Sequence, residues 1–144
     1  MIYKRSVNYY ETDGMRIVHH SNYIRYLEEA RCEFLKQIGL PYEKIEEMGF
    51  MVPVLEVHCK YKMPAKFGTI MNIEVKIKEF DGIKLVIGYT ITEEKTDTII
   101  VEAETKHCFT NQNMRPISLK KENKEMYNTF MEYQKQKLNK KLNA

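Results

Sequence analysis

The sequence lacks the features of a membrane-spanning or secreted protein. No window approaches the roughly 18 consecutive apolar residues of a membrane span, and the opening MIYKRSVNYY has no long apolar stretch behind its positive charges, as a signal peptide would. The three cysteines, Cys32, Cys59 and Cys108, include no CxxC pair, which fits reduced thiols better than a disulfide framework. We therefore expect a cytoplasmic protein with no membrane span.

An excess of charge of one sign is also missing. The 23 basic and 20 acidic residues are mixed along most of the chain and leave a formal charge of +3. A nucleic-acid groove spread over the fold would need more clustered positive charge, so no nucleic-acid partner is expected. The 144 residues fit a single domain over 1–144, which at this length buries on the order of 70% of its unfolded surface.

The stretch from Ser21 to Gly39 has the spacing of an amphipathic helix. Ser21 is suited to be the N-cap, while Gly39 followed by Pro41 is suited to end the helix. The expected apolar face consists of Ile24, Leu27, Ala30, Phe34 and Ile38. A short second helix is expected in PYEKIEEMG, residues 41–49.

From about residue 50 to residue 110 the pattern changes to the period of two that is typical of strands. Strands are expected in 2–10, 50–63, 69–80, 83–92 and 98–110, and Asp81-Gly82 predicts a tight hairpin between the third and the fourth. From about residue 117, Met126, Phe130 and Tyr133 have helical spacing and predict a C-terminal helical tail laid on the surface. One long helix with several antiparallel strands is an α+β unit, in which the sheet can wrap the helix.

This order of elements, together with YYETDGMRIVHHSNYIRYLEEAR at 9–31, resembles the 4-hydroxybenzoyl-CoA thioesterase family of the hotdog fold, in which a curved antiparallel sheet wraps a central helix. The resemblance covers roughly residues 3–112. Its specific residues are Thr12, Asp13, Ile17, Val18, His20, Tyr23, Glu28, Ala30 and Arg31, and Pro64-Ala65 ahead of a strand is a second feature. It implies hydrolysis of acyl-CoA thioesters, or of acyl-carrier-protein thioesters, in a site between two subunits of a homodimer or homotetramer, with no metal and no cofactor.

The resemblance also implies roles for single residues. Asp13 falls on the family's catalytic carboxylate, and His20 falls where a backbone N–H at the start of the long helix polarises the thioester carbonyl. Tyr9 matches a tyrosine found in the site of some members. Arg16 stands where the family usually has glycine, and we expect it to contact the substrate or narrow the entrance.

The chemistry of a thioester fits this loop and helix start. The reaction needs a polarised carbonyl and either an activated water or a nucleophile. Free N–H groups in the first helical turn, near His20 to Tyr23, carry partial positive charge and suit a developing oxyanion. Asp13 can act as general base or attack directly to give an anhydride. The alternative is that Asp13-Gly14 is only a turn-forming pair.

Other polar residues allow structural as well as functional interpretations. The His-Cys pairs at 58–59 and 107–108 contain zinc ligands, but neighbouring strand residues point to opposite faces, which favours ordinary sheet residues. His19 is expected to be structural, and Arg31 to form a structural ion pair. Lys62 and Lys66, with Lys60, either contact the phosphates of coenzyme A or are solvated.

The main rival to a thioesterase is a non-catalytic hotdog module that binds or senses an acyl-CoA. Turnover over a panel of acyl-CoAs separates the two, because a sensor binds the ligand without releasing the thiol.

Overall fold

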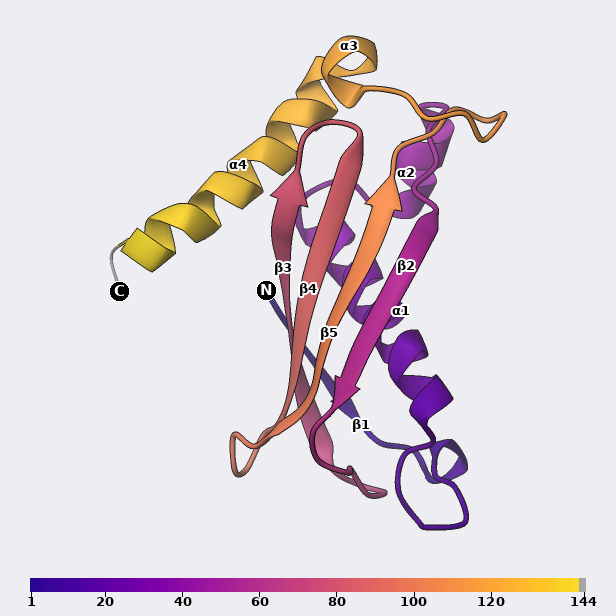
Figure 1. Cartoon of the computed structure of the whole chain (residues 1–144), viewed down its shortest axis with the longest axis vertical. Helices are drawn as coiled ribbons and strands as arrows, with labels where there is room; N and C mark the ends of the chain where they lie inside the picture. Colours follow the sequence, from indigo (N-terminus) through magenta and orange to yellow (C-terminus); the bar gives the residue numbers. More distant parts are fainter. Residues whose placement is uncertain (143–144) are drawn as a thin grey trace.

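The alternating residues between 69 and 110 form the centre of a five-stranded antiparallel sheet, seen in the computed structural model of Figure 1. The structure describes the backbone of residues 1–142 and the side chains of residues 1–135. The strands are β1 (Ile2–Ser6), β2 (Val54–Tyr61), β3 (Ile70–Phe80), β4 (Lys84–Glu93) and β5 (Ile99–Cys108), in the order β1-β3-β4-β5-β2. The first strand is shorter than expected, because the chain leaves the sheet and forms the 3-10 helix η1 (Tyr9–Glu11).

Side chains on the inner face of the sheet line up in rows across the strands. One row crosses all five strands and consists of Tyr3, Ile73, Ile91, Val101 and Tyr61. Its three central members are fully buried. Residues of the other parity, such as Glu74 and Lys78, face outward, and Lys78 pairs with Glu104 at 3.3 Å. The period of two thus separates a core face from a charged outer face.

The expected hairpin at Asp81-Gly82 joins β3 to β4. One carboxylate oxygen of Asp81 accepts hydrogen bonds from the N–H groups of Ile83, at 2.9 Å, and Lys84, at 2.7 Å. Gly82 has φ +94°, a conformation that glycine adopts without a steric cost. The tight hairpin predicted at Asp81-Gly82 is therefore confirmed.

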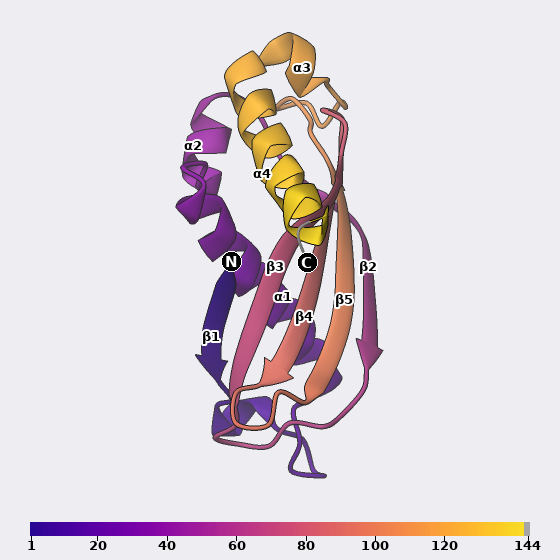
Figure 2. The ribbon, with the colours of Figure 1, turned by 90° about the vertical axis from the view of Figure 1, so that its left-hand side faces the viewer.

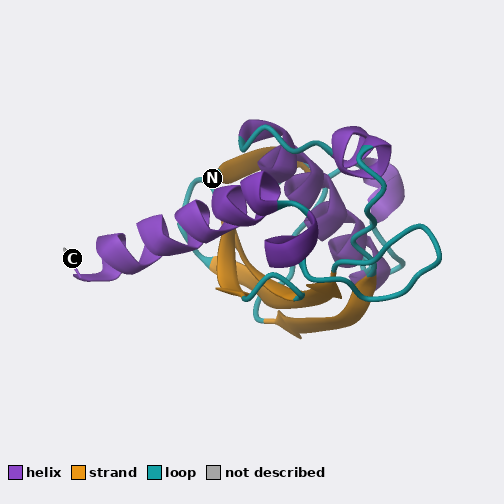
Figure 3. Ribbon diagram, turned by 90° about the horizontal axis from the view of Figure 1, so that it is seen from above, coloured by secondary structure: helices purple, strands orange, loops and turns teal. Residues whose placement is uncertain are grey.

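The long helix α1 (His20–Gln37) packs against the inner face of the sheet. Figure 3 shows the helices on one side of the curved layer of strands. The buried residues of α1 are Tyr23, Tyr26, Leu27, Ala30, Arg31, Phe34 and Leu35. Placing Ile24 on this face was wrong, because Ile24 is 47% exposed and the large ring of the neighbouring Tyr23 takes the buried position.

Arg31 is buried with the apolar side chains, which corrects the expected ion pair. Its hydrogen bonds go to the hydroxyl oxygens of Tyr42 and Tyr89, and no salt bridge of Arg31 is found within the described residues. Tyr42 begins the short helix α2 (Tyr42–Glu47), which was expected from the sequence.

Both ends of α1 are defined by local hydrogen bonds. The N-cap is His19 and not Ser21: the Nδ1 atom of His19 accepts from the Ser21 N–H at 3.2 Å, and Ser21 lies inside the helix. His19 therefore has the structural place expected for it. At the other end Gly39 has φ +81°, and the Leu40 N–H returns to the Leu35 carbonyl at 2.8 Å, as in a glycine-terminated helix.

The C-terminal segment forms α3 (Leu119–Glu122) and α4 (Lys124–Leu142), and Figure 2 shows α4 beside β3, against which it packs. Its Phe130 is fully buried, with the ring centroid 5.2 Å from that of Phe80 and 5.4 Å from that of Phe109. The start of α4 therefore completes the core, whereas the sequence predicted a helix lying on the surface. None of the helices in the described part of the chain is long and apolar enough to cross a membrane.

Candidate active site

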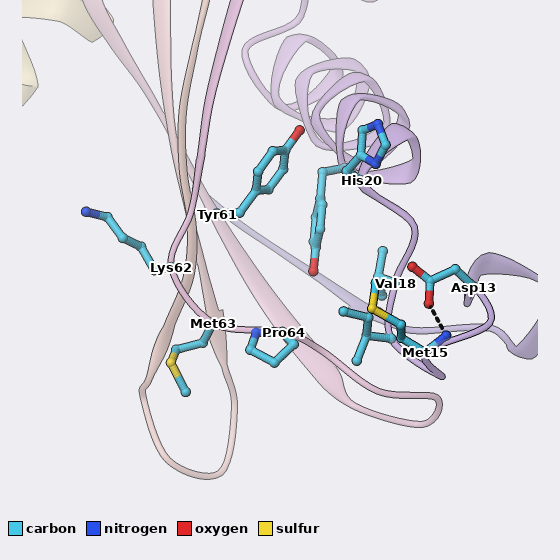
Figure 4. A pocket seen from close by; sticks show the side chains of 10 residues that line it. Asp13, Met15, Val18, His20, Tyr61, Lys62, Met63 and Pro64 are labelled. Carbon is cyan, nitrogen blue, oxygen red and sulfur yellow. Dashed lines mark hydrogen bonds between the residues drawn. The ribbon is translucent and has the colours of Figure 1, made fainter.

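Two loops meet at the end of the sheet where α1 begins. The Asp13 loop, residues 12–19, joins η1 to α1, and the 62–69 loop follows β2. The Val18 N–H donates to the Ala65 carbonyl at 2.9 Å, and Ile17 forms a β-bridge with Lys66. Between these loops lies an open cavity of about 380 Å³, shown in Figure 4.

Asp13 borders this cavity and also shapes the loop. One carboxylate oxygen accepts from the Met15 N–H at 2.8 Å, as the dashed line in Figure 4 marks, and the Asp13 carbonyl accepts from the Arg16 N–H at 2.9 Å. The carboxylate is only partly buried, and its other oxygen is directed toward the side of the cavity where Val18 lies. Asp13 is thus a turn residue with one oxygen left for other chemistry.

His20, the first residue of α1, borders the same cavity. The His19 N–H donates to the Glu11 carbonyl, and the Ser21 and Asn22 N–H groups both donate back to His19. For the His20 N–H, no acceptor is found in the part of the chain that the structure describes, although His20 borders the cavity. A free N–H at the positive end of a helix is suited to hold negative charge on an oxygen.

The His20 imidazole lies outside the loop hydrogen bonds. Its ring stacks on that of His19 with centroids 4.4 Å apart, and it meets the Tyr61 ring edge-on at 6.4 Å. The role of the His20 backbone N–H as an oxyanion donor stays a prediction.

Two tyrosines form one wall of the cavity. Tyr23 comes from α1 and Tyr61 from the end of β2, with ring centroids 5.5 Å apart. Burial raises the pKa of Tyr23 to about 12, so its phenol stays neutral at physiological pH. Tyr61 is half-exposed. This wall offers apolar and aromatic surface to a ligand, with Met63 beside it.

Only some of the residues expected at the site line the cavity. Asp13, His20 and Lys62 do, and the Lys62 ammonium lies 3.9 Å from a Glu102 carboxylate oxygen. The others, Tyr9, Arg16 and Lys66, are exposed and are not among the lining residues. The Tyr9 ring contacts Phe67 instead, with centroids 5.8 Å apart.

Arg16 has a backbone conformation that is uncommon for a residue with a side chain. Its φ is +65°, in the left-handed region that glycine adopts most easily. The loop therefore closes in spite of the side chain, through the Arg16 N–H bond to the Asp13 carbonyl at 2.9 Å.

Tyr61 was not among the predicted site residues, although the alternation along its strand contained a signal for it. Tyr61 has the same parity on β2 as Val57 and Cys59, whose side chains pack against the core, so alternation places its ring on the side of α1. Within the described residues, no group of three His, Cys, Asp or Glu side chains is placed to hold a metal ion.

Comparison with known proteins identifies the family. The family model described as the Thioesterase-like superfamily matches residues 7–137. The chain belongs to this family. The acyl-CoA thioesterase YbgC of Helicobacter pylori is 31% identical over 133 residues, which cover 86% of this chain and 97% of that protein.

Solved structures agree with this family. The crystal structure of a hypothetical protein from Aquifex aeolicus matches with a TM-score of 0.82 and 38% identity, covering 90% of this chain and 98% of that one. The DHNA-CoA thioesterase from Staphylococcus aureus matches with a TM-score of 0.87 over 97% of this chain and 93% of that one, and at 23% identity this likeness concerns the fold. The expected hotdog fold and the assignment to thioester hydrolases are confirmed, at the level of this superfamily rather than of the narrower 4-hydroxybenzoyl-CoA thioesterases.

Proposed function

We propose that the protein hydrolyses acyl-CoA thioesters in the cavity between the Asp13 loop and the end of β2. The observation that carries this proposal is that Asp13 and His20 border one cavity and that the His20 N–H has no acceptor within the described residues. A carboxylate that moves a proton and a donor for the oxyanion are the two groups that acyl transfer to water requires.

In the proposed reaction the thioester carbonyl oxygen accepts a hydrogen bond from the His20 N–H. Asp13 removes a proton from a water molecule while the water oxygen attacks the carbonyl carbon. The tetrahedral intermediate then expels the thiolate of coenzyme A, which takes up a proton, and the free acid is released. The alternative route has Asp13 attack the carbonyl carbon itself to give a mixed anhydride, which water then hydrolyses. Neither route requires a metal or another cofactor.

The other lining residues fit the two ends of such a substrate. Tyr23, Tyr61 and Met63 provide apolar surface for an acyl group. Lys62 borders the same opening and is suited to meet a phosphate as a point charge. In this proposal Arg16, Lys66 and Tyr9 reach the substrate only outside the cavity, where its polar portion leaves the protein.

The deciding experiment is a thiol-release assay over acyl-CoAs with short, long and aromatic acyl groups, including 4-hydroxybenzoyl-CoA and the thioester of an acyl-carrier protein. Turnover of at least one thioester supports the proposal, and the preferred acyl group names the substrate. Binding of acyl-CoA in calorimetry without any thiol release would instead identify a sensing module.

The proposal includes an assembly of two or four copies of the chain. Strand β2 lies at the edge of the sheet, where β5 is its one partner strand within the described residues, and it exposes Val54 and Leu55. An exposed edge strand with apolar side chains is suited to pair with another copy. Light scattering at micromolar concentration tests this, and a single species of the chain mass, 17.2 kDa, contradicts it. The cytoplasmic location stays a prediction.

A further inference from the structure

Glu11 is buried next to the Asp13 loop although it carries a charge. It is 4% exposed. Its two carboxylate oxygens each accept a hydrogen bond from the Arg5 guanidinium at 2.6 Å, and one also accepts from the Asn8 N–H at 2.7 Å. Burial alone would raise the pKa of Glu11, but these hydrogen bonds outweigh it and lower the pKa. The carboxylate therefore stays ionised and tightly held.

Arg5 is in turn fixed against α1. Its Nε donates to a carboxylate oxygen of Glu29 at 3.0 Å, and its guanidinium carbon lies 4.1 Å from the centroid of the Tyr26 ring. Because Arg5 belongs to β1 and both partners belong to α1, the Glu11 carboxylate is anchored to two rigid elements at once.

The main chain of Glu11 makes a second connection, to the start of α1. Its carbonyl oxygen accepts from the His19 N–H at 2.9 Å and from the Asn22 side-chain amide at 2.9 Å. Residue 11 comes just before the Asp13 loop and residue 19 ends it, so one carbonyl holds both ends of the loop. Neither Glu11 nor Asn22 lines the cavity.

We infer that Glu11 and Asn22 are positioning residues that set the Asp13 carboxylate against the His20 N–H. This inference rests on the proposed function. Asp13 follows Glu11 by two residues and His20 follows His19 by one, so both reacting groups are one or two residues from the hydrogen bonds that close the loop. A displacement of about 1 Å at a reacting group can lower the rate on the order of 10²-fold.

The test compares Asn22→Ala and Glu11→Gln with a matched control, Glu29→Gln. Glu29 shares Arg5 as a partner, but a glutamine there can still accept from the Arg5 Nε through its amide oxygen. Arg5 also keeps both bonds to Glu11 and its place on the Tyr26 ring, so this control removes a charge without releasing the Glu11 carboxylate. Hydrogen exchange of the amides at 12–19 is measured together with kcat and KM for the best acyl-CoA of the panel. For Asn22→Ala and Glu11→Gln we expect faster exchange in the loop and a tenfold or larger fall in kcat, with KM changed less than threefold. Glu29→Gln leaves loop exchange and kcat within twofold.

Two results overturn the inference. The first is a folded Asn22→Ala protein with wild-type loop exchange and wild-type kcat. The second is an equal loss in Glu29→Gln, which would mean that the charges only stabilise the fold. If Glu11→Gln does not fold, Asn22→Ala still decides the test. Asn22→Ala removes a single neutral hydrogen-bond donor and no charge. Hydrogen exchange is recorded without substrate and so does not depend on activity. If the wild-type protein cleaves no thioester, the proposed function is refuted, but the exchange data still decide whether Glu11 and Asn22 hold the loop.

Discussion

Arg31 Nη1 donates a hydrogen bond to the hydroxyl of Tyr89 at 3.1 Å, in the interface between α1 and the sheet. The Tyr89 hydroxyl also bonds Thr105 at 2.7 Å, and Thr105 bonds His107 Nε2 at 2.8 Å. A buried guanidinium is thus tied to a neutral chain of side chains on β4 and β5. Such groups are costly to leave without partners in a low-dielectric interior.

Tyr89→Phe is therefore expected to destabilise the protein. The substitution keeps the ring but removes one hydrogen-bond partner from Arg31, which keeps Tyr42, and one from Thr105, which keeps His107. The loss of a buried partner typically costs about 1–3 kcal/mol of unfolding free energy. Tyr42→Phe is the matched control, because Tyr42 also accepts from Arg31, at 2.9 Å, but is only partly buried, so water can replace its hydroxyl. Urea unfolding measures both. A Tyr89→Phe protein as stable as the wild type would show that Arg31 does not need the phenol.

His107, the last member of this series of hydrogen-bonded side chains, predicts a pH dependence of stability. Burial and the positive charge of Arg31 lower the pKa of His107 to about 4. The unfolded chain takes up this proton near pH 6.5, so between pH 6.5 and 4 the unfolded state binds more protons and stability falls as the pH falls. At about 1.4 kcal/mol for each unit of pKa difference, the full effect is on the order of 3 kcal/mol.

The measurement is urea unfolding between pH 7 and pH 5, where the carboxylates contribute least. The His107→Gln protein is the control, and we expect its unfolding free energy to change less over this range. An equal slope in the wild type and in His107→Gln would assign the pH dependence to other groups.

Local patterns in the sequence predicted the sheet well, because the alternation of a strand depends only on residues that are close together in the sequence. Alternation placed Met71, Ile73, Val75 and Ile77 on the core face, and all four are buried. Errors arose where a distant contact decides. Ser21 is a good cap by residue type, but the helix begins where the Glu11 carbonyl binds the His19 N–H, which moves the cap to His19.

In the candidate site too, local sequence patterns were predicted correctly and contacts between distant residues were missed. Asp13 and His20 lie on one loop and the following turn of helix, so the family pattern within a short stretch sufficed to bring them together. Tyr61 reaches them only because β2 pairs with β5 at the edge of the sheet, a result of strand order that the local pattern does not contain. The partners of Arg31 were missed for the same reason, since Tyr89 lies on β4, 58 residues further along the chain.

Arg16→Gly distinguishes two possible effects of Arg16, backbone strain in the loop and contact with the substrate. A non-glycine residue at φ +65° costs on the order of 1–3 kcal/mol, part of which glycine loses again through greater freedom of the unfolded chain. We expect Arg16→Gly to be about 0.5–1 kcal/mol more stable, with kcat little changed because Arg16 does not line the cavity. If Arg16 meets the polar portion of the substrate, KM rises or acyl preference changes.

Arg16→Ala is the control for this comparison, because it removes the same side chain while keeping the strain. A rise in KM shared by both variants would belong to the lost side chain. Kinetics unchanged in both over the whole acyl panel would show that Arg16 has no part in binding.

Asp13→Asn tests whether Asp13 reacts or only bends the chain. Asparagine can still accept the Met15 N–H through its amide oxygen and still favours the turn, so the loop and the melting temperature are expected to stay nearly unchanged. The charge that activates water or attacks the carbonyl is lost. We therefore expect thioester turnover to fall on the order of 10²- to 10⁴-fold, the range for a positioned acid–base group.

Asp13→Ala completes this comparison, because alanine removes both the charge and the acceptor for the Met15 N–H. If Asp13 is the reagent, asparagine and alanine lose similar amounts of kcat, and only alanine also lowers the melting temperature. If Asp13 only shapes the loop, asparagine is almost silent in catalysis and alanine chiefly lowers stability. A well-folded Asp13→Asn protein with kcat near that of the wild type, binding a substrate analogue as before, would therefore reject the catalytic role and leave Asp13 as a turn residue.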